Sequence, residues 1–265
     1  MIWIKRSAVV FSLAAILLSA ACSKSETSTT NSISPGESGS VATEAATAAP
    51  ITIDPNAATV AGTVKLEGTP PAMAPIPMAG DPYCQQAHPQ PVLSDEVAVG
   101  PGGALANVFV YVKDFKGNAV PPQTPAVLEQ QGCMYHPHVM GVQVGQKFEV
   151  KNSDSTLHNV HAMAETNKSF NIGQPVPMTS ERTFSVPEVM VRVKCDVHPW
   201  MHAWVGVLPH PYFAVSSGTG EFTIHNLPPG TYTIEAWHEK YGTQSQQVTV
   251  GAKESKAVSF TFKAS

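Results

Sequence analysis

Residues that bind soft metals occur in two short stretches of the sequence. His158 stands in the triplet HNV, and the run CDVHPWM supplies Cys195, His198 and Met201. A thiolate, two imidazoles and a thioether form a ligand set that selects copper over calcium, magnesium or manganese. Two histidines and a cysteine with a weak axial methionine suit neither Cu(I) nor Cu(II) strongly, so little rearrangement separates the two states. The pattern therefore predicts one copper site that passes single electrons.

The spacing of the second stretch brings its three ligands to one place. Residues 189–195 alternate as a strand does, so Cys195 would end a strand, and Pro199 would stiffen a tight loop that returns His198 and Met201. Taken alone, a histidine such as His158 is more often a hydrogen-bonded strand residue, and a methionine is more often core packing. The combination of the two stretches favours ligands.

At these positions the sequence resembles the cupredoxins, and among them the amicyanin-like subgroup with a short ligand loop. The resemblance implies a type-1 copper site, with one copper ion per chain. His158 and His198 would bind through ring nitrogens, Cys195 through its thiolate, and Met201 as the long axial ligand.

The same resemblance implies further roles at Asn159, His198 and Trp200. Asn159 would lie behind them and tie the His158 segment to the Cys195 loop. His198 would break the surface in an apolar patch beside Trp200, and the two would form the electron port. For Trp204 and Trp237 we expect core packing.

Several histidines lie outside this ligand set. They are His136, His138, His161, His202 and His210. Such a surplus could build a second metal site, whereas each one singly is expected to be structural or exposed. His88, four residues after Cys84, would make a soft-metal pair with it, but a disulfide accounts for that cysteine more simply.

The start of the chain has the pattern of a targeting segment. Lys5 and Arg6 precede an apolar stretch, and the sequence LSAAC ends at Cys22. This resembles the lipobox of bacterial lipoproteins, which implies a signal peptide at 1–21 and lipid on Cys22. The protein would then be membrane-anchored in the bacterial cell envelope, facing the periplasm or the exterior. Ordinary secretion and an uncleaved anchor helix are the alternatives.

Cysteine arithmetic follows from that assignment. The sequence has four cysteines. With Cys22 lipidated and Cys195 on copper, Cys84 and Cys133 remain for a disulfide, because an exported chain should not keep spare thiols. This bond would pin the Pro-rich segment 69–91 to the copper domain's first strand. The competing pairing joins Cys195 to Cys84 or Cys133 and removes the copper thiolate.

Composition and local patterns predict an all-β chain. Charged residues make up only 14%, while 23 prolines and 19 glycines favour short strands and turns. Residues 220–234, with the turn LPPG, resemble the carboxypeptidase regulatory-like, transthyretin-like sandwiches, whose first strand resembles residues 62–68 far upstream.

We therefore expect three parts after the signal peptide. A disordered tether covers 22–56, a carboxypeptidase regulatory-like sandwich is built from 57–120 plus 211–265, and a cupredoxin-like Greek-key sandwich at 121–210 is inserted in it. Two domains in series are the alternative.

The net charge of the chain argues against one class of partner. The formal net charge of −4 becomes −6 once Lys5 and Arg6 leave with the signal peptide, and no Lys/Arg cluster follows, so nucleic acid is a poor candidate. We expect electron transport between envelope redox proteins, such as a c-type cytochrome or a dehydrogenase.

The alternatives are a copper scavenger or chaperone without electron transfer, and a structural module. An enzyme is not expected, since no nucleophile triad or paired-carboxylate motif stands out and copper reductases need a further catalytic copper.

Overall fold

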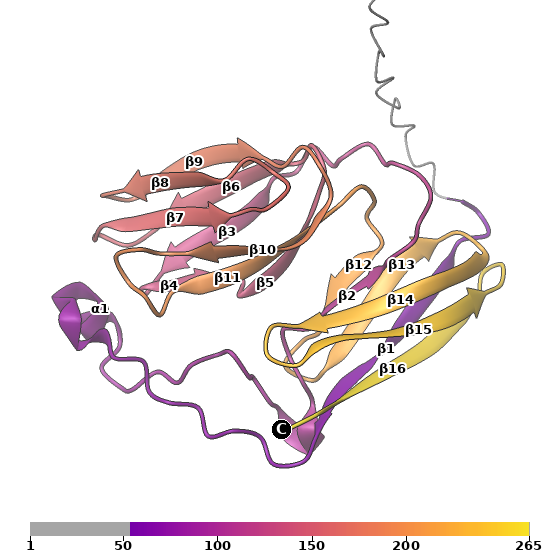
Figure 1. The fold of residues 1–265 in the computed structure, drawn as a ribbon, viewed down its shortest axis with the longest axis horizontal. Helices are drawn as coiled ribbons and strands as arrows, with labels where there is room; N and C mark the ends of the chain where they lie inside the picture. The colour runs from indigo at the N-terminus through magenta and orange to yellow at the C-terminus, as the bar shows by residue number, and fades with distance from the viewer. Residues whose placement is uncertain (1–53, 265) are drawn as a thin grey trace, which may run out of the picture. The chain divides into compact units, whose positions relative to one another are not determined.

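A computed structural model of the chain describes residues 54–264. The predicted signal peptide, the lipidation site Cys22 and the tether as far as residue 53 lie outside the described residues. Between residues 54 and 264, no helix is long and apolar enough to cross a membrane. The prediction of an all-β class is confirmed, since two β-sandwiches account for nearly all of the regular structure (Figure 1).

One sandwich is assembled from strands far apart in the sequence. In its first sheet, β1 (Ala58–Glu67) lies between an antiparallel β13 and a parallel β16. The second sheet has the order β12-β2-β14-β15. The remaining bounds are β2 (Phe109–Val112), β12 (Phe213–Val215), β13 (Glu221–Leu227), β14 (Gly230–His238), β15 (Gly242–Val250) and β16 (Ser255–Lys263).

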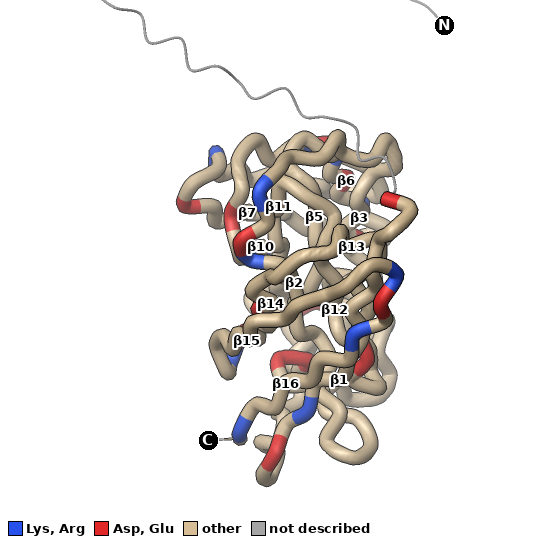
Figure 2. Tube along the Cα trace, turned by 90° about the vertical axis from the view of Figure 1, so that its right-hand side faces the viewer, with Lys and Arg blue, Asp and Glu red and all other residues tan. Residues whose placement is uncertain are grey.

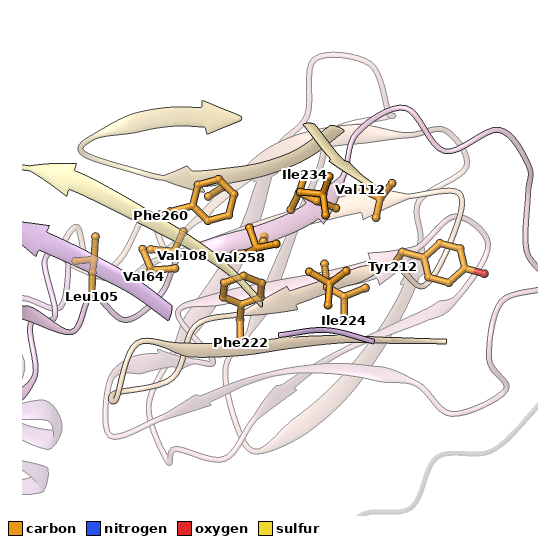
Figure 3. Close-up of a cluster of buried hydrophobic side chains, with 14 of the residues drawn as sticks. Val64, Leu105, Val108, Val112, Tyr212, Phe222, Ile224, Ile234, Val258 and Phe260 are labelled. Carbon is orange, nitrogen blue, oxygen red and sulfur yellow. The ribbon is translucent and has the colours of Figure 1, made fainter. Parts of the chain in front are cut away.

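The core of this sandwich follows from the alternation of its strands. Val64 on β1, Phe222 and Ile224 on β13, Ile234 on β14 and Phe260 on β16 are all buried, and their side chains point toward one another (Figure 3). Because successive residues of a strand face opposite sides, each strand gives one apolar row to the space between the sheets.

The second sandwich lies between β2 and β12 in the sequence. Its two sheets have the strand orders β4-β3-β6-β9 and β5-β11-β10-β7-β8. The bounds are β3 (Ala126–Gln131), β4 (Met134–His136), β5 (Val139–Gln143), β6 (Lys147–Asn152), β7 (His158–Met163), β8 (Phe170–Gln174), β9 (Met178–Thr183), β10 (Glu188–Lys194) and β11 (His202–Leu208). Leu128, Phe148, Val160 and Val193 are completely buried in its core.

An apolar interface joins the two sandwiches. Phe109 on β2 is buried together with Val139 and Leu208 of the second sandwich. A Cβ on Gly206 of β11 would lie 2.4 Å from the ring of Phe109, so glycine is needed here for that ring to approach the strand. The predicted packing role of Trp204 and Trp237 agrees with this, because their rings meet here at 5.0 Å.

The segment between β1 and β2 extends to the second sandwich. It contains helix α1 (Pro82–Ala87), which begins after Asp81, whose Oδ1 accepts hydrogen bonds from the N–H groups of Tyr83 and Cys84. The predicted disulfide between Cys84 and Cys133 is confirmed. Cys133 lies in the turn between β3 and β4, with φ of 56°, and not in the first strand as expected. The disulfide thus fixes α1 to the second sandwich.

Candidate metal centre

The metal-binding residue types converge at one end of the second sandwich. His158 begins β7, Cys195 directly follows β10, and His198 and Met201 lie in the loop that leads into β11. That loop closes on itself, since Met201 N–H donates to the His198 carbonyl at 2.9 Å and Cys195 N–H donates to the Met201 carbonyl at 3.0 Å. Two backbone hydrogen bonds therefore set the loop's shape.

Three ligand atoms face one another inside this site. The Nδ1 atoms of His158 and His198 are 2.9 Å apart, and Sγ of Cys195 lies 3.8 Å from Nδ1 of His198. All three residues are buried, as is Met201, which belongs to the same apolar cluster as Cys195. Within residues 54–264, Cys195 is the one cysteine outside a disulfide, so the competing pairing of Cys195 does not form.

The remaining ring nitrogens are held by carboxylates. Nε2 of His158 lies 2.9 Å from Oδ2 of Asp154, and Nε2 of His198 lies 3.1 Å from Oδ2 of Asp81. With Nε2 of each ring turned to a carboxylate, both Nδ1 atoms face the interior of the site. A cation can lie between these nitrogens and the sulfur, either a proton on one Nδ1 that the other accepts or a metal ion that all three atoms bind. The donor set therefore fits a soft, monovalent or divalent metal ion.

The pKa values of Cys195, His158 and His198 are shifted by their surroundings. Burial opposes ionisation of the Cys195 thiol, but hydrogen bonds from the His158 side chain and from nearby backbone N–H groups outweigh it and lower its pKa. Burial also opposes charge on His158, yet Asp154 and Cys195 raise its pKa to about 9. The pKa of His198 is lowered, first by burial and then by the charge of His158. The surroundings of Cys195 thus favour its thiolate form, while those of His158 favour its charged form.

Asn159 holds the two ligand segments together. Its Oδ1 accepts a hydrogen bond from the N–H of Asp196 at 2.7 Å and lies 3.4 Å from Sγ of Cys195. Its Nδ2 donates to the side chains of Asp196 and Asn171, at 3.0 and 2.8 Å. The side chain thus links β7 to the ligand loop through protein contacts alone.

One family model and several solved structures are similar to parts of this chain. Residues 201–263 match the model of the carboxypeptidase regulatory-like domain, and no curated protein matches the chain. A purple cupredoxin from Nitrosopumilus maritimus is 22% identical over 31% of this chain and 98% of its own, with a TM-score of 0.27. An oxidised amicyanin mutant is 21% identical over 31% of this chain and 79% of its own, with a TM-score of 0.28.

A copper-containing nitrite reductase from Thermus scotoductus SA-01 is also similar, with 20% identity over 36% of this chain and a TM-score of 0.30. This chain spans about a quarter of that reductase. The second sandwich, made of a four-stranded and a five-stranded sheet, carries His158, Cys195 and His198. The residues that match the carboxypeptidase regulatory-like model include β11 of the second sandwich and β12 to β16 of the first, but neither β1 nor β2.

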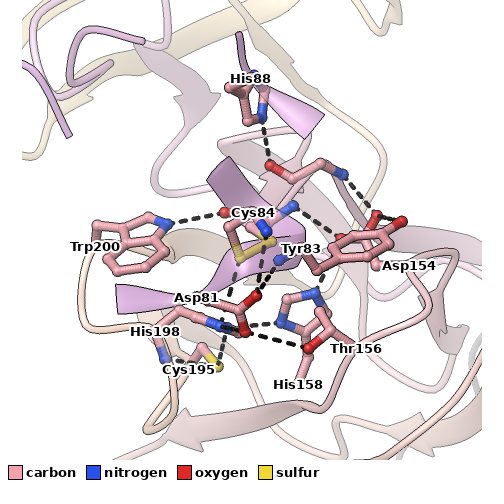
Figure 4. The surroundings of a disulfide bond; sticks show 12 residues. Asp81, Tyr83, Cys84, His88, Asp154, Thr156, His158, Cys195, His198 and Trp200 are labelled. Carbon is pink, nitrogen blue, oxygen red and sulfur yellow. Dashed lines mark hydrogen bonds and ion pairs between the residues drawn. A yellow bond between two sulfur atoms is a disulfide. The ribbon is translucent and has the colours of Figure 1, made fainter. Parts of the chain in front are cut away.

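One expectation about the candidate site is wrong. His198 was expected to break the surface, but its side chain is only 3% exposed. Asp81 and α1 cover it, and Sγ of Cys84 lies 3.5 Å from its Nε2 (Figure 4). The disulfide holds this cover in place. Trp200 is half-buried, with its ring 5.1 Å from that of His198 and its Nε1–H donating to the carbonyl of Cys133.

Sequence reasoning missed the two carboxylates of the site. Asp154 precedes His158 by four residues, a spacing that gave a local signal for an ion pair. Asp81 lies 117 positions before His198, and the only local signal at Asp81 was the helix start DPYC. Since carboxylates that hold the outer nitrogen fix the tautomer of a ligating imidazole, both belong to the site.

The other histidines are dispersed. His136 is exposed, His161 faces Asp196 at 3.1 Å, and His210 is buried against Tyr212. His88 contacts the carbonyl of Gly132, so it does not share a metal with Cys84. His138 and His202 lie together at a different place from the Cys195 site.

Proposed function

We propose that this protein is a mononuclear type-1 copper protein that carries single electrons between redox proteins of the bacterial cell envelope. The observation that carries the proposal is the pair of Nδ1 atoms, from His158 and His198, 2.9 Å apart beside the thiol of Cys195. Copper bound there would supply a Cu(I)/Cu(II) couple, with Met201 as the axial ligand.

The surrounding residues support this role by holding the donors still. Asp154 and Asp81 orient the two imidazoles, and Asn159 fixes the segment that bears Cys195. Ligands locked by hydrogen bonds and by a packed β-framework keep one geometry when the charge of the site changes. A small rearrangement between oxidation states is what a carrier of single electrons needs.

We place the exit for electrons at Trp200. His198 is covered, whereas the ring of Trp200 is partly exposed and lies 5.1 Å from the His198 ring. The indole also donates to the carbonyl of Cys133, so its position is fixed relative to the site. This revises the predicted port, in which His198 itself would reach the surface.

The partner would be a c-type cytochrome or a dehydrogenase, and lipid on Cys22 would keep the carrier near it. Acidic and basic residues are interspersed along the chain (Figure 2), and the net charge is mildly negative. A diffuse charge of this kind suits brief encounters with a basic partner more than tight docking.

Optical and spin-resonance spectra of the copper-loaded protein test the proposal. We expect intense visible absorption from thiolate-to-copper charge transfer, which Cys195→Ser and His158→Gln abolish. His161→Gln is the matched control, since His161 lies on the same strand and faces Asp196 instead. A copper-loaded protein that is colourless and shows no reversible potential would rule the proposal out.

A copper scavenger or chaperone is the second candidate. It is favoured by the additional gathering of His138, His202 and Glu239. Two or more tightly held copper ions per chain, combined with no reversible potential, would support it over the electron carrier.

A further inference from the structure

A second group of metal-binding side chains lies at the junction of the two sandwiches. His138 directly precedes β5, His202 begins β11, and Glu239 lies in the turn between β14 and β15. One atom from each lies within 4.8 Å of the others. The first two residues belong to the cupredoxin-like sandwich and the third to the other, so the group exists only where the two meet.

One carboxylate is bracketed by two imidazoles in this group. Nε2 of His202 lies 3.1 Å from Oε2 of Glu239, and Nε2 of His138 contacts Oε1 of the same side chain. The centres of the two rings are 4.9 Å apart, in an edge-on arrangement. Both Nε2 atoms therefore point at the same small volume.

The outer nitrogens of both rings face acceptors. Nδ1 of His138 lies 3.4 Å from Oδ2 of Asp95, and Nδ1 of His202 lies 3.2 Å from the carbonyl oxygen of Trp200. An Nδ1–H that donates to a carboxylate or a backbone carbonyl is the usual way in which a metal-ligating imidazole is oriented. It leaves the Nε2 lone pairs directed at Glu239, where lone pairs and a carboxylate repel unless a cation lies between them.

The group is sheltered without being sealed. The side chains of His138, Glu239 and His202 are 5%, 9% and 18% exposed. Trp204 covers Glu239 and donates its Nε1–H to Oε2 at 2.9 Å. A buried carboxylate that is fixed by an indole and faces two imidazoles is a preorganised ligand, and the partial exposure of His202 leaves a route for an ion.

We propose that His138, His202 and Glu239 bind a divalent transition-metal ion, zinc or copper(II), at a second site separate from Cys195. Two imidazoles and a carboxylate, without a thiolate, suit borderline divalent ions. Three protein ligands leave a coordination position for water or a small ligand. Because the ligands come from both sandwiches, the ion holds the two together. The rival occupant is a proton, which would make the group a structural histidine–glutamate ion pair.

Metal-stripped wild-type protein decides between the ion and the proton. Crystals soaked in zinc and, separately, in copper(II) are measured at the absorption edge of each metal. We expect an anomalous peak within bonding distance of Nε2 of His138, Nε2 of His202 and a Glu239 oxygen, and an increase in melting temperature on addition of one equivalent of zinc. No peak and no increase would assign the site to a proton and overturn the proposal.

Variants then assign the stoichiometry. Glu239→Gln and His202→Gln should each lower the bound metal by one equivalent per chain and keep the Cys195 charge-transfer band. The control His136→Gln, an exposed histidine, should keep both equivalents. If the two variants do not fold, the wild-type diffraction still decides.

The outcome is independent of the proposed function. Cys195→Ser should abolish the colour and leave the metal at Glu239 in place. A metal at Glu239 in a protein without charge-transfer absorption would contradict only the electron-carrier proposal. A coloured protein with one metal per chain would contradict only the second site.

Discussion

Oδ2 of Asp81 lies 3.1 Å from Nε2 of His198, whose Nδ1 lies 3.8 Å from Sγ of Cys195. A carboxylate from the segment between β1 and β2 therefore bonds directly to a ligand of the candidate metal centre. It orients the imidazole, and it places a negative charge one ring away from the position of the metal. The cover over His198 is thus also part of the site's electrostatics.

Replacement of Asp81 tests that relationship. Asp81→Asn should raise the reduction potential, because loss of a nearby negative charge disfavours the more positive oxidation state. A Coulombic effect on the order of 1–3 kcal/mol corresponds to about 40–130 mV for one electron. Asparagine also caps helices, so α1 should still form. Voltammetry measures the potential, and Glu129→Gln, a carboxylate bonded to Lys151 instead, is the control. An unchanged potential would contradict the role given to Asp81.

Removal of the disulfide tests the cover itself. The double substitution Cys84→Ser and Cys133→Ser opens a loop with a sequence separation of 49 and should lower the free energy of unfolding by about 2–4 kcal/mol. It should also speed electron exchange with a small inorganic reagent, because α1 is freed from His198. Urea unfolding and stopped-flow reduction measure the two effects. A destabilised variant with an unchanged exchange rate would show that the cover does not limit access.

Substitution of Met201 distinguishes an axial ligand from a side chain that only packs in the core. Met201→Leu conserves volume, so unfolding free energy should change by less than about 1.5 kcal/mol. The visible band should persist, and the potential should rise by tens of millivolts, because the axial thioether tunes the copper. Met140→Leu, another buried methionine of the same cluster, should leave the potential as it is. Identical potentials in both variants would assign Met201 to packing alone.

His210 should make the stability of the fold depend on pH. Burial against Phe115 and Tyr212 lowers its pKa to about 4, from an ordinary value of 6.5. Between pH 6.5 and 4, His210 is therefore protonated in the unfolded chain and neutral in the folded chain. The contribution of neutral His210 to the free energy of unfolding is fully present above pH 6.5. As the pH falls to about 4 this contribution is lost, which lowers the free energy of unfolding by about 1–3 kcal/mol.

Chemical unfolding across this range, comparing wild type with His210→Gln, isolates the contribution of His210. His225→Gln, an exposed histidine of the same sandwich, should keep the wild-type slope. If His210→Gln shows the wild-type slope as well, the titrating group is another one.

The junction of the sandwiches can be tested at Gly206. A Cβ there would lie 2.4 Å from the ring of Phe109, so Gly206→Ala should lower the free energy of unfolding by about 1–3 kcal/mol. Gly173→Ala on β8 is the control, since nothing lies within 4 Å of its added Cβ. Denaturant unfolding measures both. Equal free energies of unfolding for Gly206→Ala and Gly173→Ala would contradict a close packing contact between Gly206 and Phe109.

The local pattern of apolar and polar residues predicts part of the β-structure and the loop that carries the candidate ligands. The alternation of residues 189–195 predicts a strand that ends at Cys195, and β10 is observed over Glu188–Lys194. The ligand loop was readable because Cys195, His198 and Met201 lie within seven residues. By contrast, β5 and the end of β11 are buried on both faces, so their sequences show no alternation and were not predicted.

The residue types of the candidate site and the all-β class were thus predicted from the sequence alone, since each depends on residue type or short-range period. The sequence left alternative pairings of the cysteines open, and the structure decided for Cys84 with Cys133. Tertiary structure alone decided that Asp81 covers His198 and that Glu239 meets His138, at separations of 117 and 101 residues. Such contacts leave no periodic trace in the sequence, because they arise only when distant parts of the chain pack into two sandwiches that meet at an apolar interface.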